Sequence, residues 1–141
     1  EKEKQNIPDI TEKLEGKRIL LAEDNELNAE IAETVLVEAG IEVKRVEDGL
    51  QCIEELKKMP ENYYDVILMD VQMPNMDGYT ATQRIRDLDD SRAEIPIIAM
   101  TANAYDEDRR KAQEEGMDGF LAKPLDVDEM MRLLGKITKT E

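Results

Sequence analysis

Short apolar runs separated by longer segments with helical spacing dominate the hydrophobic pattern of the chain. Ile19 to Ala22, Val66 to Met69 and Ile97 to Met100 contain only apolar residues, and such short runs are typical of strands buried on both faces of a sheet. Two further strands are expected from Glu42 to Val46 and from Gly119 to Ala122.

A predicted helix follows each predicted strand. The apolar spacing and the stop signals at Gly40 and Pro60 place these helices at Leu27 to Ala39, Leu50 to Lys58, Tyr79 to Asp87, Tyr105 to Glu115 and Val127 to Ile137. Parallel strands need crossover connections, so this alternation predicts an α/β fold in which helices cover both faces of a parallel sheet. Ligands of such open sheets bind beyond the carboxyl ends of the strands.

Composition narrows the class of protein. The 141 residues suit one domain with one substantial core, and no apolar run approaches the ~18 residues of a membrane span. With 19 basic and 34 acidic residues the formal net charge is −15, which disfavours binding to nucleic acid or to anionic membranes. The single cysteine, Cys52, cannot form an internal disulfide, and no segment resembles a secretion signal, so a cytoplasmic location is expected.

The first sixteen residues differ from the rest of the chain. They are highly charged, carry Pro8, and precede the first strand-like run, so residues 1–16 are predicted to be a linker or tail and residues 17–141 the folded domain. A tether to a catalytic kinase core is favoured over an ordinary disordered tail.

Polar residues follow four of the predicted strands. They are Glu23 and Asp24, then Asp70, Thr101 and Lys123, and they should meet at one edge of the sheet. Three neighbouring carboxylates repel unless a cation compensates them, and oxygen ligands without His or Cys select a hard ion such as Mg²⁺. Beside this metal, with an ammonium and a hydroxyl nearby, Asp70 is a workable nucleophile that would form an acyl phosphate.

Four motifs at these strand ends resemble those of a known family. LLAEDN, VILMDVQMPNMDG, IIAMTAN and FLAKPL resemble, in this order, the receiver domains of two-component signalling, and the similarity spans Lys17 to Lys139. The forms AEDNELN, MTANAY and AKPL are most similar to receivers attached to hybrid sensor histidine kinases. The resemblance implies a flavodoxin-like receiver fold, with five parallel strands in the order 2-1-3-4-5, that works as a conformational switch in a phosphorelay.

The resemblance also implies how the acceptor site is built. Asp70 would be phosphorylated, and Asp24 and Asp70 would bind Mg²⁺ directly. Glu23 would assist through metal-bound water, and the backbone carbonyl of Gln72 would complete the protein ligands. Lys123 would contribute its ammonium, directed at the phosphate by a cis bond to Pro124.

Other matched residues concern the switch and the lifetime of the acyl phosphate. Thr101 and Phe120 match the switch hydroxyl and the switch aromatic, although Phe120 lacks the phenol hydroxyl that some readouts need and could be an ordinary core residue. Gln72 and Asn103 are expected to tune dephosphorylation, because amides orient water but are weak bases. The helix from Tyr105 to Glu115 has a thin apolar stripe, which predicts that it rearranges on activation together with residues 119–137.

The expected partners follow from what the chain lacks. It contains no histidine and no nucleotide-binding kinase motif, so the phosphoryl donor must be the phosphohistidine of a histidine kinase or of a histidine phosphotransfer domain elsewhere. The receiver itself would catalyse phosphotransfer and autodephosphorylation. A homodimer through the helices 105–115 and 127–137 is a further expectation.

Three other classes of function share part of this pattern. A metal-dependent phosphatase or dehalogenase-like hydrolase also uses an aspartate nucleophile, but typically has a second aspartate where this chain has Gln72. A degenerate interaction module does not need the complete set of rim residues, and a flavodoxin-like cofactor binder needs a Ser/Thr-rich phosphate loop after the first strand, which is missing. Taken alone, Glu23 and Asp24 could also be a helix N-cap.

Overall fold

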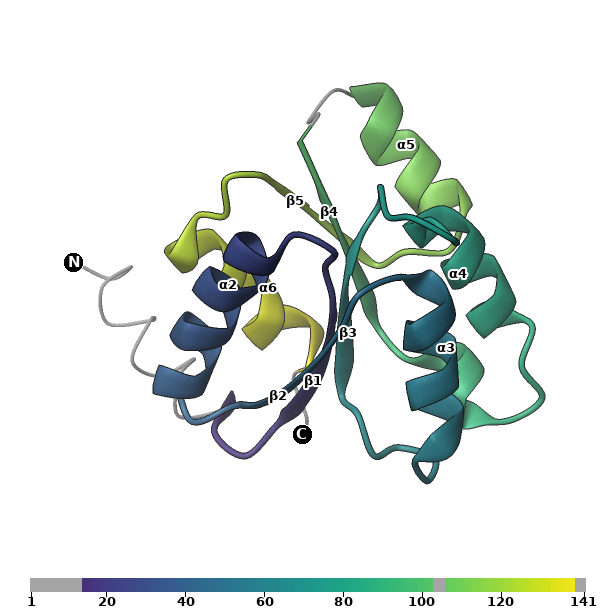
Figure 1. The fold of residues 1–141 in the computed structure, drawn as a ribbon, viewed down its shortest axis with the longest axis horizontal. Coiled ribbons are helices and arrows are strands. Elements are labelled where there is room, and N and C mark those ends of the chain that lie inside the picture. Colours follow the sequence, from purple (N-terminus) through teal and green to yellow (C-terminus); the bar gives the residue numbers. More distant parts are fainter. Residues whose placement is uncertain (1–13, 103–105, 139–141) are drawn as a thin grey trace.

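A central sheet separates two layers of helices in the computed structural model, which describes residues 14–102 and 106–138 (Figure 1). The strands are β1 (Arg18–Ala22), β2 (Glu42–Val46), β3 (Val66–Asp70), β4 (Ile97–Thr101) and β5 (Gly119–Ala122). The α-helices are α2 (Glu26–Glu38), α3 (Gly49–Lys58), α4 (Gly78–Arg86), α5 (Asp106–Glu114) and α6 (Val127–Ile137), and a short 3₁₀ helix spans Ser91–Glu94.

All neighbouring strands are parallel, and their order is β2-β1-β3-β4-β5. This order confirms the α/β fold and the strand order predicted above. Every residue of β3 and β4 is buried, as expected of central strands covered on both faces.

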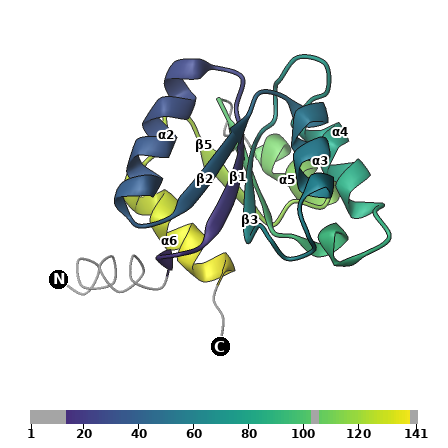
Figure 2. The ribbon, with the colours of Figure 1, turned by 60° about the horizontal axis from the view of Figure 1, so that its bottom comes forward.

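Two clusters of apolar side chains form the core, one on each face of the sheet. Helices α2 and α6 cover one face, whereas α3, α4 and α5 cover the other (Figures 1 and 2). Alternate residues of each strand point to opposite clusters, so Leu68 belongs to the α2–α6 cluster and Met69 to the α3–α5 cluster. No helix in the described part of the chain is long and apolar enough to cross a membrane.

Three details of the structure were not expected from the sequence. Asp70 and Thr101 are the last residues of β3 and β4 rather than the residues after them, because their backbones still pair with Met100 and Ala122. Leu14, which lies within the predicted linker 1–16, is 1% exposed and packs in the α2–α6 cluster. The 3₁₀ helix was not predicted; Asp90 caps it by accepting a hydrogen bond from the backbone of Arg92.

Candidate functional site

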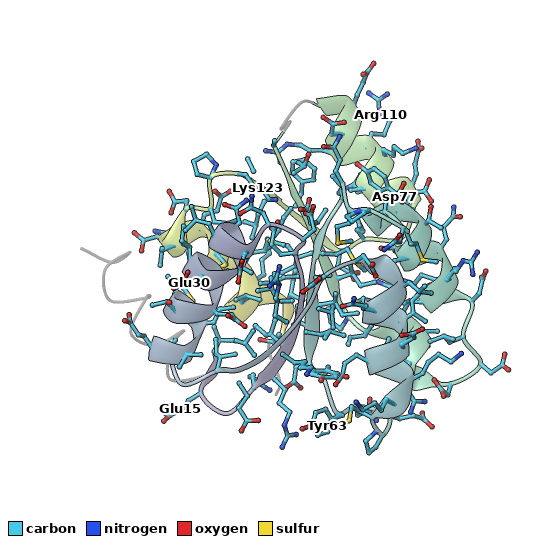
Figure 3. All side chains as sticks on the ribbon, in the orientation of Figure 1. Glu15, Glu30, Tyr63, Asp77, Arg110 and Lys123 are labelled. Atoms are coloured by element: carbon cyan, nitrogen blue, oxygen red, sulfur yellow. The ribbon has the colours of Figure 1, made fainter. Side chains whose placement is uncertain are left out.

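The carboxyl ends of β1, β3, β4 and β5 bring the predicted rim residues to one edge of the sheet. In Figure 3, Lys123 lies at this edge, whereas Tyr63, which precedes β3, lies at the opposite end of the molecule. A cleft of about 270 Å³ opens here, lined by Glu23, Asp24, Asn25, Asn28, Asp70, Val71, Gln72, Ala102 and Lys123. The parallel sheet therefore gathers residues that are up to a hundred positions apart in the sequence.

Asp70 lies at the centre of this edge, at the end of the fully buried strand β3, and is 4% exposed. Its Oδ1 accepts a hydrogen bond from the backbone N–H of Gln72 at 3.2 Å, and its Oδ2 accepts one from Lys123 Nζ at 2.9 Å. Helix α4 starts close behind it, because a Cβ on Gly78 would lie only 2.4 Å from the Asp70 carbonyl oxygen. The carboxylate is thus held rigidly and faces the cleft.

Lys123 follows β5 and connects two of the acidic residues. Its backbone N–H donates to the Thr101 carbonyl at 2.8 Å, and its bond to Pro124 is cis, as predicted. The Nζ atom lies 3.0 Å from Glu23 Oε1 as well as 2.9 Å from Asp70 Oδ2. Burial lowers the pKa of Lys123, but the hydrogen bonds and charges of Asp70 and Glu23 outweigh it and raise the pKa.

Glu23 and Asp24 occupy the turn after β1 and differ in their exposure. Glu23 is 2% exposed, and its burial, together with the charge of Asp70, raises its pKa despite the hydrogen bonds it accepts from Lys123 and from the Asn25 backbone. Asp24 is exposed to the cleft. The N-cap interpretation of this pair is wrong, because Asn25 caps α2 by accepting a hydrogen bond from the Asn28 backbone.

The other predicted site residues lie around the same edge. Thr101 ends β4 and is 4% exposed, and the Gln72 side chain is exposed at the rim of the cleft. Phe120 is partly buried against the α3–α5 cluster, with the Arg109 guanidinium 4.9 Å from its ring centre. Asn103 lies outside the described residues, so its predicted role stays a prediction.

Other residues, which the sequence did not indicate, hold the site in place. Arg45, in β2, donates from Nε to the Glu23 carbonyl at 3.0 Å and from Nη2 to the Asp24 carbonyl at 3.2 Å. Asp48 is buried and accepts a hydrogen bond from Asn75, in the loop after Asp70. The Asp48-Gly49 pair before a helix is a recognisable cap signal, but no sequence pattern indicates its partner 27 residues away.

The donor atoms of the edge fit a hard cation. Oxygen atoms of Glu23, Asp24 and Asp70 all lie within 4.8 Å of one another, and the described chain offers neither sulfur nor imidazole beside them. Clustered carboxylates with an open cleft are the donor set that magnesium uses while keeping several water ligands. One ammonium cannot neutralise three carboxylates, which leaves net negative charge at the site.

Comparison with known proteins identifies the family. The family model of the response regulator receiver domain matches residues 19–135, so the chain belongs to this family. Its solved relatives include the receiver domain of a sensor histidine kinase from Pseudomonas aeruginosa, with 40% identity and a TM-score of 0.79 over 89% of this chain and 99% of that one. That structure has a magnesium ion coordinated in the active-site cleft.

The curated relatives are histidine kinases, which this chain matches over a small part of their length. The peroxide stress-activated histidine kinase mak1 of Schizosaccharomyces pombe is 40% identical over 86% of this chain and 8% of its own length. The sensor histidine kinase RcsC of Escherichia coli is 39% identical over 82% of this chain and 12% of its own length. The chain thus matches one segment of much longer histidine kinases, in agreement with the sequence resemblance.

Proposed function

We propose that Asp70 of this receiver domain accepts a phosphoryl group from a phosphohistidine, that the transfer requires Mg²⁺, and that the acyl phosphate switches the domain between two conformations. The observation that carries the proposal is the bridge from Lys123 Nζ to Asp70 and Glu23, at 2.9 and 3.0 Å, beside the exposed carboxylate of Asp24. This arrangement supplies a nucleophile and a positive charge at one open cleft.

The proposed cofactor is supported by the donor atoms and by a relative. Glu23, Asp24, Asp70 and the backbone carbonyl of Gln72 are the proposed protein ligands, with Glu23 acting through bound water. The Pseudomonas aeruginosa receiver, 40% identical, holds magnesium in its active-site cleft. Bound there, Mg²⁺ would neutralise charge on the transferring phosphoryl group.

The proposed transfer is an in-line displacement. A carboxylate oxygen of Asp70 forms a bond to phosphorus while the bond between phosphorus and the imidazole nitrogen of the donor breaks and its electron pair returns to the imidazole. The Lys123 ammonium stabilises the negative charge on the phosphoryl oxygens. Hydrolysis later attaches a water oxygen to phosphorus and restores the Asp70 carboxylate and inorganic phosphate.

The remaining predicted roles belong to the switch and to the lifetime of the product. Thr101, buried at the end of β4, is the proposed hydroxyl that moves toward the phosphoryl group, and Phe120 is the proposed aromatic that follows it. The exposed side chain of Gln72 reaches the cleft rim, from which it can orient an attacking water. Asn103 is proposed for the same role on sequence grounds alone.

The parent protein and partners are proposed from the relatives. We infer a hybrid histidine kinase as parent, because the first seven curated relatives are histidine kinases of which this chain spans 5 to 13%. The donor is then the kinase itself or a histidine phosphotransfer domain. A cytoplasmic location, a tether formed by the charged start of the chain, and dimerisation through α5 and α6 complete the proposal.

Incubation with acetyl phosphate tests the function directly. With Mg²⁺ the intact domain should gain the mass of one phosphoryl group, and hydroxylamine should remove it, as it does from acyl phosphates. Asp70→Asn and an excess of EDTA should each abolish the adduct. A matched control is Asp77→Asn, which keeps an N-cap side chain on α4 outside the cleft. An adduct that persists in Asp70→Asn, or that resists hydroxylamine, would reject the proposal.

A further inference from the structure

The loop between β3 and α4, residues 71–77, carries the proposed Gln72 ligand and is fastened to a distant part of the chain. Asp48, at the junction between β2 and α3, is 4% exposed and uses both carboxylate oxygens. Its Oδ1 accepts a hydrogen bond from the Gln51 backbone at 2.8 Å, which caps α3. Its Oδ2 accepts a hydrogen bond from Asn75 Nδ2 at 2.7 Å, which holds the loop.

A second contact joins the same two segments. The backbone N–H of Gly49 donates to the Met76 carbonyl at 3.0 Å. A Cβ on Gly49 would lie 2.6 Å from that carbonyl oxygen and 2.9 Å from the Ala81 Cβ, so only glycine allows this approach. The junction and the loop are therefore built to touch each other.

The loop also has backbone features of its own. Asn75 has a φ of +66°, in the left-handed region that asparagine tolerates better than most residues. At its base the loop is closed by the Gly78 N–H, which donates to the Val71 carbonyl at 3.1 Å. The base is thus held by its own backbone and by the Gln72 N–H, which donates to Asp70 Oδ1 at 3.2 Å, whereas the far end is held by Asp48 and Gly49.

We propose that Asp48 is a positioning residue of the phosphoryl-acceptor site: through Asn75 it fixes the loop 71–77, and with it the Gln72 carbonyl, before the metal binds. Capping α3 needs only one side-chain oxygen, which a serine provides. The second carboxylate oxygen of Asp48 is therefore not needed for the cap, and it accepts a hydrogen bond from the loop. The inference rests on the function proposed above. It assigns a role to Asp48 and Asn75, which are not among the proposed metal ligands.

Two variants remove the hydrogen bond between Asp48 and Asn75. Each keeps what the backbone needs at its own position, which is a cap on α3 at residue 48 and a positive φ at residue 75. Asp48→Ser keeps a helix-capping oxygen but cannot reach Asn75, and Asn75→Gly keeps the left-handed conformation but has no amide. Asp48→Asn is the conservative variant, because its oxygen can cap α3 while its NH₂ group donates to Asn75 Oδ1 once the Asn75 amide has turned over. Each is measured by Mg²⁺ titration calorimetry, by hydrogen exchange of residues 71–77 in EDTA, and by thermal unfolding.

Asp48→Ser and Asn75→Gly should each weaken Mg²⁺ binding on the order of tenfold, the lower end of the effect of outer-shell residues. Both should speed hydrogen exchange of the loop without metal, and Asp48→Asn should stay near the wild type. The double variant should bind Mg²⁺ no more weakly than either single variant, because the two residues act through one contact.

Several results would overturn the inference. If the melting temperature falls but Mg²⁺ affinity and loop exchange stay unchanged, Asp48 is only a helix cap. Additive losses of affinity in the double variant would mean that the two residues act separately. Failure of the proposed function looks different, because the wild type would then bind no Mg²⁺ or take no phosphoryl group.

Discussion

Removing the Lys123 ammonium should expose how strongly the site depends on its single positive charge. Lys123→Ala leaves Glu23 and Asp70, which are 2% and 4% exposed, without their cationic partner. Breaking a fully buried ion pair on one side costs about 3–5 kcal/mol. The Lys123 side chain is 19% exposed beside a cleft, so water screens part of this loss, and we expect the free energy of unfolding to fall by about 2–3 kcal/mol in metal-free buffer.

Magnesium should compensate this loss. A ligand at 100 times its dissociation constant stabilises a fold by about 2.7 kcal/mol. Without the ammonium, the three carboxylates hold more uncompensated charge and should bind the cation more tightly, so at one Mg²⁺ concentration the gain should be larger for Lys123→Ala than for the wild type. The chain has no tryptophan, so unfolding in urea is best followed by far-UV circular dichroism, in EDTA and in Mg²⁺.

The matched control is Lys136→Ala, which removes an exposed lysine from α6 far from the cleft lining. Its stability and its response to Mg²⁺ should equal those of the wild type. The reasoning fails if Lys123→Ala is as stable as the control in EDTA. It also fails if Mg²⁺ stabilises both variants by the same amount, because the ammonium and the metal would then not share the same carboxylates.

Three other predictions concern the rest of the domain. Burial raises the pKa of the Cys52 thiol from 9.0 to about 12, so this thiol should not react with an aromatic disulfide near pH 8 until urea unfolds the chain. As the pH rises, the thiol loses its proton in the unfolded chain before it does so in the folded one. The free energy of unfolding should therefore fall between pH 9 and pH 12. Arg86→Ala removes hydrogen bonds to the carbonyls of Gly116, Ala93 and Ile95 and should lower the free energy of unfolding by about 2–3 kcal/mol, whereas the exposed Arg84→Ala should change it little. A beryllofluoride mimic should alter hydrogen exchange in α5 and in residues 119–137, and unchanged exchange there would refute the predicted switch face.

The fold was predictable because its signals are local and repeat along the chain. Apolar runs such as Val66 to Met69 indicate a buried strand wherever they stand, and alternation with helical spacing leaves few topologies once crossovers must be right-handed. The acceptor site followed from the same rule, since parallel strands deliver Asp70 and Lys123 to one edge. The ends of β3 and β4 were misjudged, because polar residues such as Asp70 and Thr101 can still pair in the sheet.

The contacts that hold the site were not predictable, because they join residues whose separation carries no pattern. Arg45 reaches the carbonyls of Glu23 and Asp24 only because β2 lies beside β1. Leu14 was assigned to the linker because its neighbours in the sequence are charged, yet its side chain completes the cluster beneath α2 and α6. Such residues are identified by their surroundings in space.

The sheet insulates one half of the domain from the other. The cluster beneath α2 and α6 shares no side chain with the cluster beneath α3, α4 and α5, and the hydrogen-bonded strands lie between them. A rearrangement of α5 alone would therefore repack only the α3–α5 cluster, and the change would reach the α2–α6 cluster through residues 119–137, which contain α6.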